Sequence, residues 1–158
     1  MTAMVVTNAG RFLISTDRAK LDVEVIHGFL TRSYWAEGIP RETVTRAIEN
    51  SLCFGVYNGA EQVGFARVVS DFATYAYLAD VFILEPYRER GLGKELIATV
   101  MAHPELQGLR RWSLGTRDAH GLYAQFGFTA LENPSRMMEI ADQEVYLSSA
   151  PDKVRQRG

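Results

Sequence analysis

The sequence predicts a mixed α/β fold, in which helices cover a sheet that contains both antiparallel and parallel strands. Short apolar segments typical of strands alternate with amphipathic helical patterns along the chain. Asn58-Gly59 separates two such segments, which indicates an antiparallel hairpin. A later pair of apolar segments is joined by a helix, which indicates parallel strands. With 158 residues, the chain is expected to form one domain, with its core over about residues 11–140.

The first elements are a strand and two helices. Residues 11–16 have the pattern of a short strand, and apolar residues at helical spacing predict a helix over 21–31. A loop with two adjacent aromatic residues follows at 33–40. Pro40 suits the first turn of a second helix, which extends to about residue 50.

An antiparallel meander follows these helices. Its strands are expected at residues 52–57, 62–69 and 75–84, and the third is so apolar that burial on both faces is expected. A helix then runs from Gly91 to His103-Pro104.

The last elements of the prediction are a strand at 110–115, a short helix at 118–126 and a final pair of strands at 127–131 and 136–140. The first of these strands follows a helical crossover and should therefore be parallel to 75–84. After about residue 147 the tail is polar. The predicted order is strand, two helices, three strands, helix, strand, helix and two strands.

Composition narrows the class of protein. The net charge of −2 argues against non-specific nucleic-acid binding, and no apolar run approaches the ~18–20 residues that span a bilayer. The only cysteine, Cys53, lies in an apolar strand, where a buried and unreactive thiol is expected. Without a signal-peptide pattern, these features predict a cytoplasmic protein.

A glycine turn between a strand and a helix is the most informative segment. Gly91 and Gly93 open the helix, where residues without a Cβ let the backbone approach a ligand closely. The first N–H groups of a helix lack partners within it, and the helix dipole favours an anion there. The segment is therefore interpreted as a pyrophosphate cradle; the alternative is a glycine turn without a ligand.

The positions of the glycines can be compared with known motifs that bind different phosphate-containing ligands. A dinucleotide-binding motif needs glycine at position 96, which is Leu96, and a Walker A loop needs glycine at position 88, which is Arg88. Arg88-x-x-Gly91-x-Gly93 resembles instead the signature loop of the GNAT superfamily of N-acetyltransferases. Residues 119–128 resemble a second segment of that superfamily, Ala-x-x-Leu-Tyr-x-x-x-Gly-Phe, and the predicted element order is also similar over about residues 12–140.

This resemblance implies acetyl-CoA as co-substrate and assigns residues to it. The end of the 75–84 strand would pair with the pantetheine amides and direct a backbone N–H at the thioester oxygen. Thr116 stands where the family usually has an asparagine, so that the contact is weakened or supplied by Asp118. The cofactor-binding residues implied are Val81, Phe82, Ile83, Arg88, Glu89, Arg90, Gly91, Leu92, Gly93, Lys94, Thr116 and Asp118.

The resemblance also implies that Tyr123 is the general acid. Its counterpart in the family protonates the departing thiolate, and a phenol with a pKa of about 10 carries a proton at neutral pH. The alternative from the residues alone is that Tyr123 packs in the core beside Leu122 and Phe126.

Asp80 is the candidate base. A carboxylate in an apolar strand is a poor strand former and is costly to bury unpaired, and such exceptions often mark functional sites. Burial would raise its pKa toward that of a useful base. The alternative is a structural Asp80 that only accepts hydrogen bonds.

Family resemblance places the acceptor site near Tyr34, Trp35 and Asp71. Adjacent aromatics and acids suit a cationic amine with an apolar body, although at least one of the two aromatics is expected to pack as a lid. The three histidines, His27, His103 and His120, have no metal-ligand spacing, so no metal is expected.

Two classes of function follow. One is an N-acetyltransferase that transfers acetyl from acetyl-CoA to a primary amine of a small molecule by direct attack, with protein acetylation as a variant. The other is a non-catalytic acyl-CoA-binding module. A homodimer formed through the C-terminal edge strands is a further expectation.

Overall fold

A six-stranded mixed sheet forms the centre of the protein, for which a computed structural model describes residues 4–6 and 11–147. The strands lie in the sheet in chain order, and only the last pair, β5 with β6, is parallel. They are β1 (Met4–Val6), β2 (Leu13–Ser15), β3 (Leu52–Asn58), β4 (Glu61–Ser70), β5 (Tyr75–Ile83) and β6 (Arg111–Ser113).

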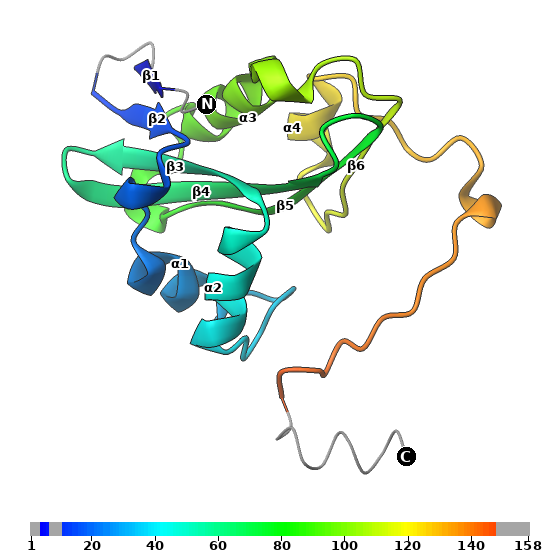
Figure 1. Cartoon of the computed structure of the whole chain (residues 1–158), viewed down its shortest axis with the longest axis horizontal. Coiled ribbons are helices and arrows are strands. Elements are labelled where there is room, and N and C mark those ends of the chain that lie inside the picture. Colours follow the sequence, from blue (N-terminus) through cyan, green and yellow to red (C-terminus); the bar gives the residue numbers. More distant parts are fainter. Residues whose placement is uncertain (1–3, 7–10, 148–158) are drawn as a thin grey trace.

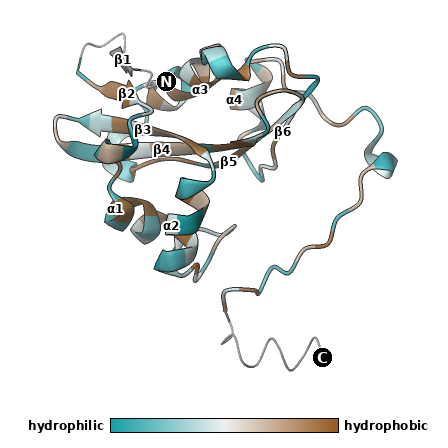
Figure 2. Ribbon diagram, in the orientation of Figure 1, coloured by the Kyte–Doolittle hydropathy of each residue, from teal (hydrophilic) through white to brown (hydrophobic). Residues whose placement is uncertain are grey.

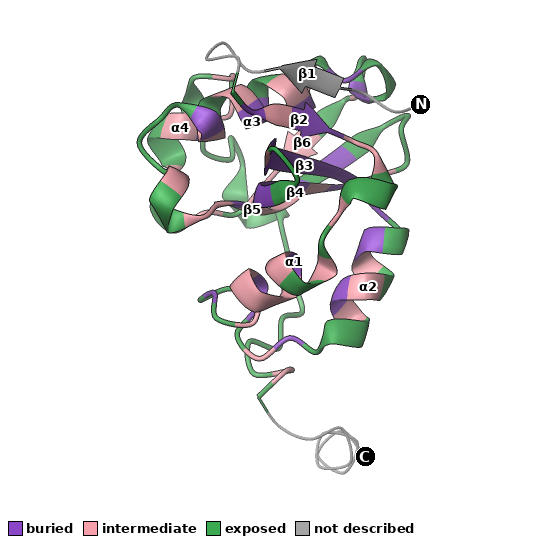
Figure 3. Cartoon of the chain, turned by 90° about the vertical axis from the view of Figure 1, so that its left-hand side faces the viewer, coloured by how far each residue is buried: buried purple, intermediate pink, exposed green. Residues whose placement is uncertain are grey.

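Helices cover both faces of this sheet (Figure 1). One face carries α1 (Val23–Leu30) and α2 (Arg41–Glu49), and the other carries α3 (Leu92–Ala102) and the short α4 (His120–Ala124). Figure 3 shows buried strands between these two helical layers, and in Figure 2 hydrophobic residues concentrate in the strands and α1. The prediction of a mixed α/β sheet is confirmed.

Two hydrophobic clusters lie on opposite faces of the sheet because successive strand residues point to opposite sides. In β3, Phe54 and Val56 pack on the α3 side, whereas Cys53 packs with Ile26 and Val44 on the α1–α2 side. Burial raises the pKa of the Cys53 thiol to about 12, so that the reactive thiolate is scarce at neutral pH. Cys53 is a buried side chain, as predicted.

The local signals in the sequence explain several element boundaries. The side chain of Asp22 accepts hydrogen bonds from the N–H groups of Glu24 and Val25 and so caps α1. Asn58-Gly59 forms the predicted hairpin, with Asn58 paired to Glu61 and Gly59 at a φ of 62°.

The predicted strand pair at 127–131 and 136–140 is wrong. A turn of 3-10 helix at Pro134–Arg136 lies between the two segments, and neither segment forms a strand. Met138 and Ile140 are fully exposed, so no buried face specifies a strand register. The segment instead runs away from the sheet in Figure 1.

At the other edge, the structure contains a strand, β1, that was not predicted. It pairs with β2 through three residues, Met4 to Ser15, Val5 to Ile14 and Val6 to Leu13. A strand of three residues is too short for a period-two pattern to identify. The polar tail expected after residue 147 lies outside the described residues.

Candidate active site

An opening in the sheet between β5 and β6 creates the site. The two strands pair only from Tyr75–Arg111 to Tyr77–Ser113, and β5 then continues to Ile83 without β6 beside it. The chain after β6 leads into α4, which carries Tyr123. Two cavities extend from this opening.

The first, here called the glycine-turn cavity, has a volume of about 510 Å³. It lies between the end of β5, the turn that opens α3 and the start of α4. Nine of the predicted cofactor residues line it: Val81, Phe82, Ile83, Arg88, Glu89, Gly91, Leu92, Gly93 and, from the other wall, Asp118. Arg90, Lys94 and Thr116 do not line this cavity.

Gly91 has the backbone conformation that the motif interpretation requires. It caps α3 in the left-handed region at φ 78°, where a residue with a Cβ is strained. A Cβ added at Gly91 or Gly93 would meet no protein atom within 4 Å. The Nε of Arg88 donates to the carbonyl of Ile83 at 2.8 Å, which ties the turn to the end of β5. The two glycines therefore leave open space at the start of α3 and are not required by a packing contact.

The second, here called the aromatic cavity, has a volume of about 730 Å³. Its walls come from the loop after α1, from β4 and β5, from the segment between β6 and α4, and from the C-terminal segment. The residues that line it include Tyr34, Trp35, Arg67, Tyr77, Asp80, Thr116, Arg117, Asp118, Tyr123 and Tyr146. The hydroxyl of Thr116 accepts from the N–H of Ala119 at 3.1 Å.

Tyr123 lines both cavities and so lies where they meet. Its side chain is buried, with 8% exposed, and its ring packs edge-on against Phe128 at 6.0 Å between centroids. Burial, and to a smaller extent the neighbouring Tyr34, raises the pKa of the Tyr123 phenol. The residue therefore packs in the core and also presents a protonated phenol to the junction.

Asp80 lies in the aromatic cavity, where both of its oxygens are hydrogen-bonded. Arg67 Nε donates to one oxygen and Trp35 Nε1 to the other, each at 2.8 Å. Asp80 has a φ of 55°, in the left-handed region, opposite an irregularity in the β4 register between Phe65 and Arg67. These contacts favour the structural interpretation of Asp80, since they hold Trp35 and Arg67 in the cavity wall.

The ion pair between Arg67 and Asp80 predicts a large effect of Asp80→Asn on stability. Asparagine tolerates the left-handed backbone, so the substitution isolates the charge. The side chains of Arg67 and Asp80 are only 20% and 11% exposed. We expect the free energy of unfolding to fall by about 3 kcal/mol because Arg67 loses its counter-ion in a desolvated site. Urea denaturation measures this.

A second arginine–carboxylate pair in the same protein provides the control. Arg41 and Glu24 approach to 2.6 Å, but their side chains are 57% and 71% exposed. Glu24→Gln should therefore cost less than about 1 kcal/mol. Equal, small losses for both variants would contradict the structural role assigned to Asp80.

The loop after α1 covers the opening. Tyr34 lines both cavities, and its hydroxyl accepts from the backbone N–H of Arg117 at 3.2 Å. The guanidinium of Arg117 lies 3.9 Å from the centroid of the Tyr34 ring, a cation–π contact. Trp35 packs edge-on against Tyr34 at 5.1 Å. Both aromatics thus form part of the wall of the two cavities.

Asp71, the third predicted acceptor residue, lies elsewhere. It lines neither cavity and shapes the turn between β4 and β5 by accepting from Ala73 N, Thr74 N and Oγ1, and Tyr75 N. The hydrogen bonds from Thr74, foremost, and from Ala73 and Tyr75 lower the pKa of its carboxyl. The structure does not bring Asp71 together with the other predicted site residues.

The histidines have local roles. His27 Nε2 pairs with the carbonyl of Ile39 at 3.0 Å, and His103 Nδ1 accepts from the N–H of Glu105 at 3.1 Å. Burial lowers the pKa of His103. His120 begins α4 and lines neither cavity. Over residues 4–6 and 11–147, no three side chains of the types His, Cys, Asp or Glu are grouped to hold a metal ion.

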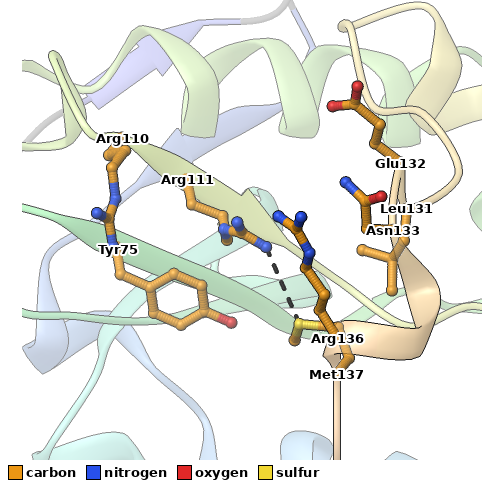
Figure 4. Close-up of a pocket in the computed structure, with 8 residues that line it drawn as sticks. All are labelled: Tyr75, Arg110, Arg111, Leu131, Glu132, Asn133, Arg136 and Met137. Carbon is orange, nitrogen blue, oxygen red and sulfur yellow. Dashed lines mark hydrogen bonds between the residues drawn. The ribbon is translucent and has the colours of Figure 1, made fainter.

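A third cavity of about 390 Å³ lies outside this site (Figure 4). Arg110 and Arg111, at the start of β6, and Arg136 surround it with Tyr75 and Met137. It shares no lining residue with the glycine-turn or aromatic cavity. Its arginines are therefore suitable control positions for variants of arginines in the aromatic cavity.

A sheet that opens between parallel strands, with a glycine turn on one side and an aromatic cavity on the other, defines a domain that can hold two ligands at one junction. Comparison with known proteins identifies its family. The model of the acetyltransferase (GNAT) family matches residues 23–128. The chain belongs to the GNAT family of acetyltransferases, as its motifs predicted.

Individual relatives agree with this assignment. A crystal structure from Xanthomonas campestris pv. campestris, of a protein attributed to the GNAT family, is 51% identical, with a TM-score of 0.85 over 87% of this chain and 97% of that one. A Gibberella zeae protein with a provisional acetyltransferase name is 33% identical over 73% of this chain and 77% of its own length.

One more distant structure shares the fold alone. It is a GNAT-family acetyltransferase from Elizabethkingia anophelis with acetyl-CoA bound, at 15% identity and a TM-score of 0.59 over 77% of this chain and 78% of that one. In the part of this chain that the structure describes, no helix is long and apolar enough to cross a membrane.

Proposed function

We propose that this protein transfers the acetyl group of acetyl-CoA to a primary amine of a small molecule, by direct attack while both are bound. The observation that carries the proposal is the junction of the glycine-turn and aromatic cavities at Tyr123. Acetyl-CoA is present in the Elizabethkingia relative, which shares this fold. A cytoplasmic location, expected from the composition, would suit this co-substrate.

The glycine-turn cavity suits the cofactor chemically. The free space at Gly91 and Gly93 and the unpaired N–H groups at the start of α3 fit a pyrophosphate, and Arg88 adds positive charge to the wall. Along β5, the backbone beyond Tyr77 has no β6 partner and can pair with amides of an extended arm. A backbone N–H near Phe82 would stabilise the charge that develops on a thioester oxygen.

When bound, the thioester supplies the carbonyl carbon that an amine attacks. As the new C–N bond forms, the C–S bond breaks and the sulfur leaves as a thiolate. Tyr123 would give its phenolic proton to that sulfur and then regain a proton from solvent. It can serve as the acid because burial keeps the phenol protonated. The proton released by the amine passes to water in this scheme, since both oxygens of Asp80 are engaged by Arg67 and Trp35.

The aromatic cavity favours a small acceptor over a protein. Tyr34 and Trp35 cover it on one side, and Tyr146 from the C-terminal segment limits it on another. A protein substrate would need an open groove for several residues beside its lysine. Protein acetylation therefore remains the second candidate within the same chemistry.

A thiol-release assay with a panel of primary amines tests the proposal, with mass spectrometry to identify the acetylated products. We expect amine-dependent thiol release and a mass increase of one acetyl group on at least one amine. Binding of acetyl-CoA by folded protein without acetylation of any amine would favour the non-catalytic acyl-CoA-binding module instead.

A further inference from the structure

The charged residues of the aromatic cavity identify the kind of amine that it fits. Four charged side chains line the cavity: Arg67, Asp80, Arg117 and Asp118. Arg67 and Asp80 neutralise each other at 2.8 Å, and Arg67 Nη1 also donates to Ser51 Oγ at 3.0 Å. This pair therefore offers little net charge to a ligand, and Arg117 and Asp118 remain.

Arg117 is held in place without an acidic partner. Its guanidinium stacks on the ring of Tyr34 at 3.9 Å, and its backbone N–H donates to the Tyr34 hydroxyl. No ion pair joins it to a carboxylate within residues 4–6 and 11–147. A guanidinium that stacks through its face keeps its N–H donors in the plane of the group, where they can bind a carboxylate or phosphate.

The two remaining charges occupy different positions. Asp118 lines both cavities, as Tyr123 does, whereas Arg117 lines the aromatic cavity alone. An acidic residue at the junction suits the ammonium end of an acceptor, and an arginine away from the glycine turn suits an anionic end. The rings of Trp35 and Tyr77 line the same cavity and can contact the carbon body between them.

We propose that the acceptor amine also carries an anionic group, a carboxylate or a phosphate ester, which Arg117 binds. This inference rests on the proposed acetyl transfer and deepens it. It replaces the expectation of a purely cationic amine, because Asp71, the acid that suggested one, lines neither cavity, and Asp80 is already paired with Arg67. An acceptor of this kind is an amino acid or an aminoalkyl phosphate.

Matched pairs of amines test the charge requirement. One pair is an amino acid and its primary amide, and the other is phosphoethanolamine and ethanolamine. We expect kcat/KM to be at least about 10-fold higher for the anionic member of one pair, and the pair that responds distinguishes a carboxylate from a phosphate. A preference for the neutral member of both pairs would overturn the inference.

Arginine variants assign that preference to one residue. Arg117→Gln removes the charge but retains the backbone N–H that holds Tyr34, and it should lower kcat/KM for the anionic acceptor about 10- to 100-fold, mainly through KM. Arg117→Lys should recover part of this loss. Arg110 is an exposed arginine of the separate cavity in Figure 4, and Arg110→Gln should leave the preference unchanged. A preference that survives Arg117→Gln would contradict the assignment.

A binding measurement separates this inference from the proposed function. Trp35 lines the cavity, so its fluorescence can be titrated with an N-acetylated amino acid and with the corresponding amide. We expect tighter binding of the acid, reduced about 10-fold or more by Arg117→Gln. If no amine is acetylated, the proposed function fails while this titration still decides the anion site. Equal binding of acid and amide would overturn that site.

Discussion

Gly91→Glu should abolish acetyl-CoA binding, whereas the parent protein should bind with a dissociation constant in the micromolar range, on the order of −8 kcal/mol. A side chain at this position meets no protein atom within 4 Å of its Cβ, so it would extend into the space left for the ligand. Its carboxylate would also repel a pyrophosphate at the start of α3. Isothermal titration calorimetry measures both proteins directly.

The matched control is Gly108→Glu. Gly108 also has a positive φ, 73° against 78° for Gly91, and a Cβ there likewise meets nothing within 4 Å. Both variants therefore carry similar backbone strain, of about 1 kcal/mol, but only Gly91 lines the glycine-turn cavity. Gly108→Glu should bind acetyl-CoA like the parent. Unchanged binding by Gly91→Glu would show that the glycine turn is structural.

Tyr123→Phe should lower kcat by about 10²- to 10⁴-fold, the range that a positioned general acid contributes. The ring contact with Phe128 is retained, so the melting temperature and the affinity for acetyl-CoA should stay close to those of the parent. Steady-state kinetics with saturating acetyl-CoA measures the effect. Parent-like turnover in the variant would leave Tyr123 with its core-packing role alone.

The pH dependence of the parent gives an independent check. Burial raises the pKa of Tyr123 above the ordinary value of 10, so its phenol is fully protonated at lower pH and ionises only as the pH rises through the raised value. We expect kcat to decline only above about pH 10 for this reason. The residual activity of Tyr123→Phe should lack this decline.

The sequence predicted the structure best where a backbone conformation depends only on the residues that adopt it. The Asn58-Gly59 hairpin and the positive φ of Gly91 follow from backbone preferences of the residues themselves. The strands expected at 127–131 and 136–140 failed because strand pairing depends on a partner and a buried face. Apolar residues such as Ile140 suggested a strand, but nothing local in the sequence shows that this side chain stays exposed.

The same difference separates the residues of the candidate site that were predicted from those that were missed. The motifs predicted Tyr123 and the glycine turn from a few consecutive residues, and both line cavities of the candidate site. Arg67, Arg117 and Tyr146 were missed because strand register and chain folding bring them together from distant positions. Only Arg67 had a usable signal, since a buried carboxylate on a neighbouring strand, Asp80, requires a cation opposite it.

Because β5 pairs with β6 only as far as Tyr77, hydrogen exchange at the β5 amides should also show whether a ligand occupies the opening between the two strands. Beyond Tyr77, the β5 amides that face β4 are held in its ladder, whereas those that face the opening lack a β6 carbonyl. Deuterium should therefore enter the amides of residues 78–83 that face the opening faster than those that are paired with β4. A bound extended arm would slow the fast set, so that hydrogen exchange could follow cofactor binding without a label or a known acceptor.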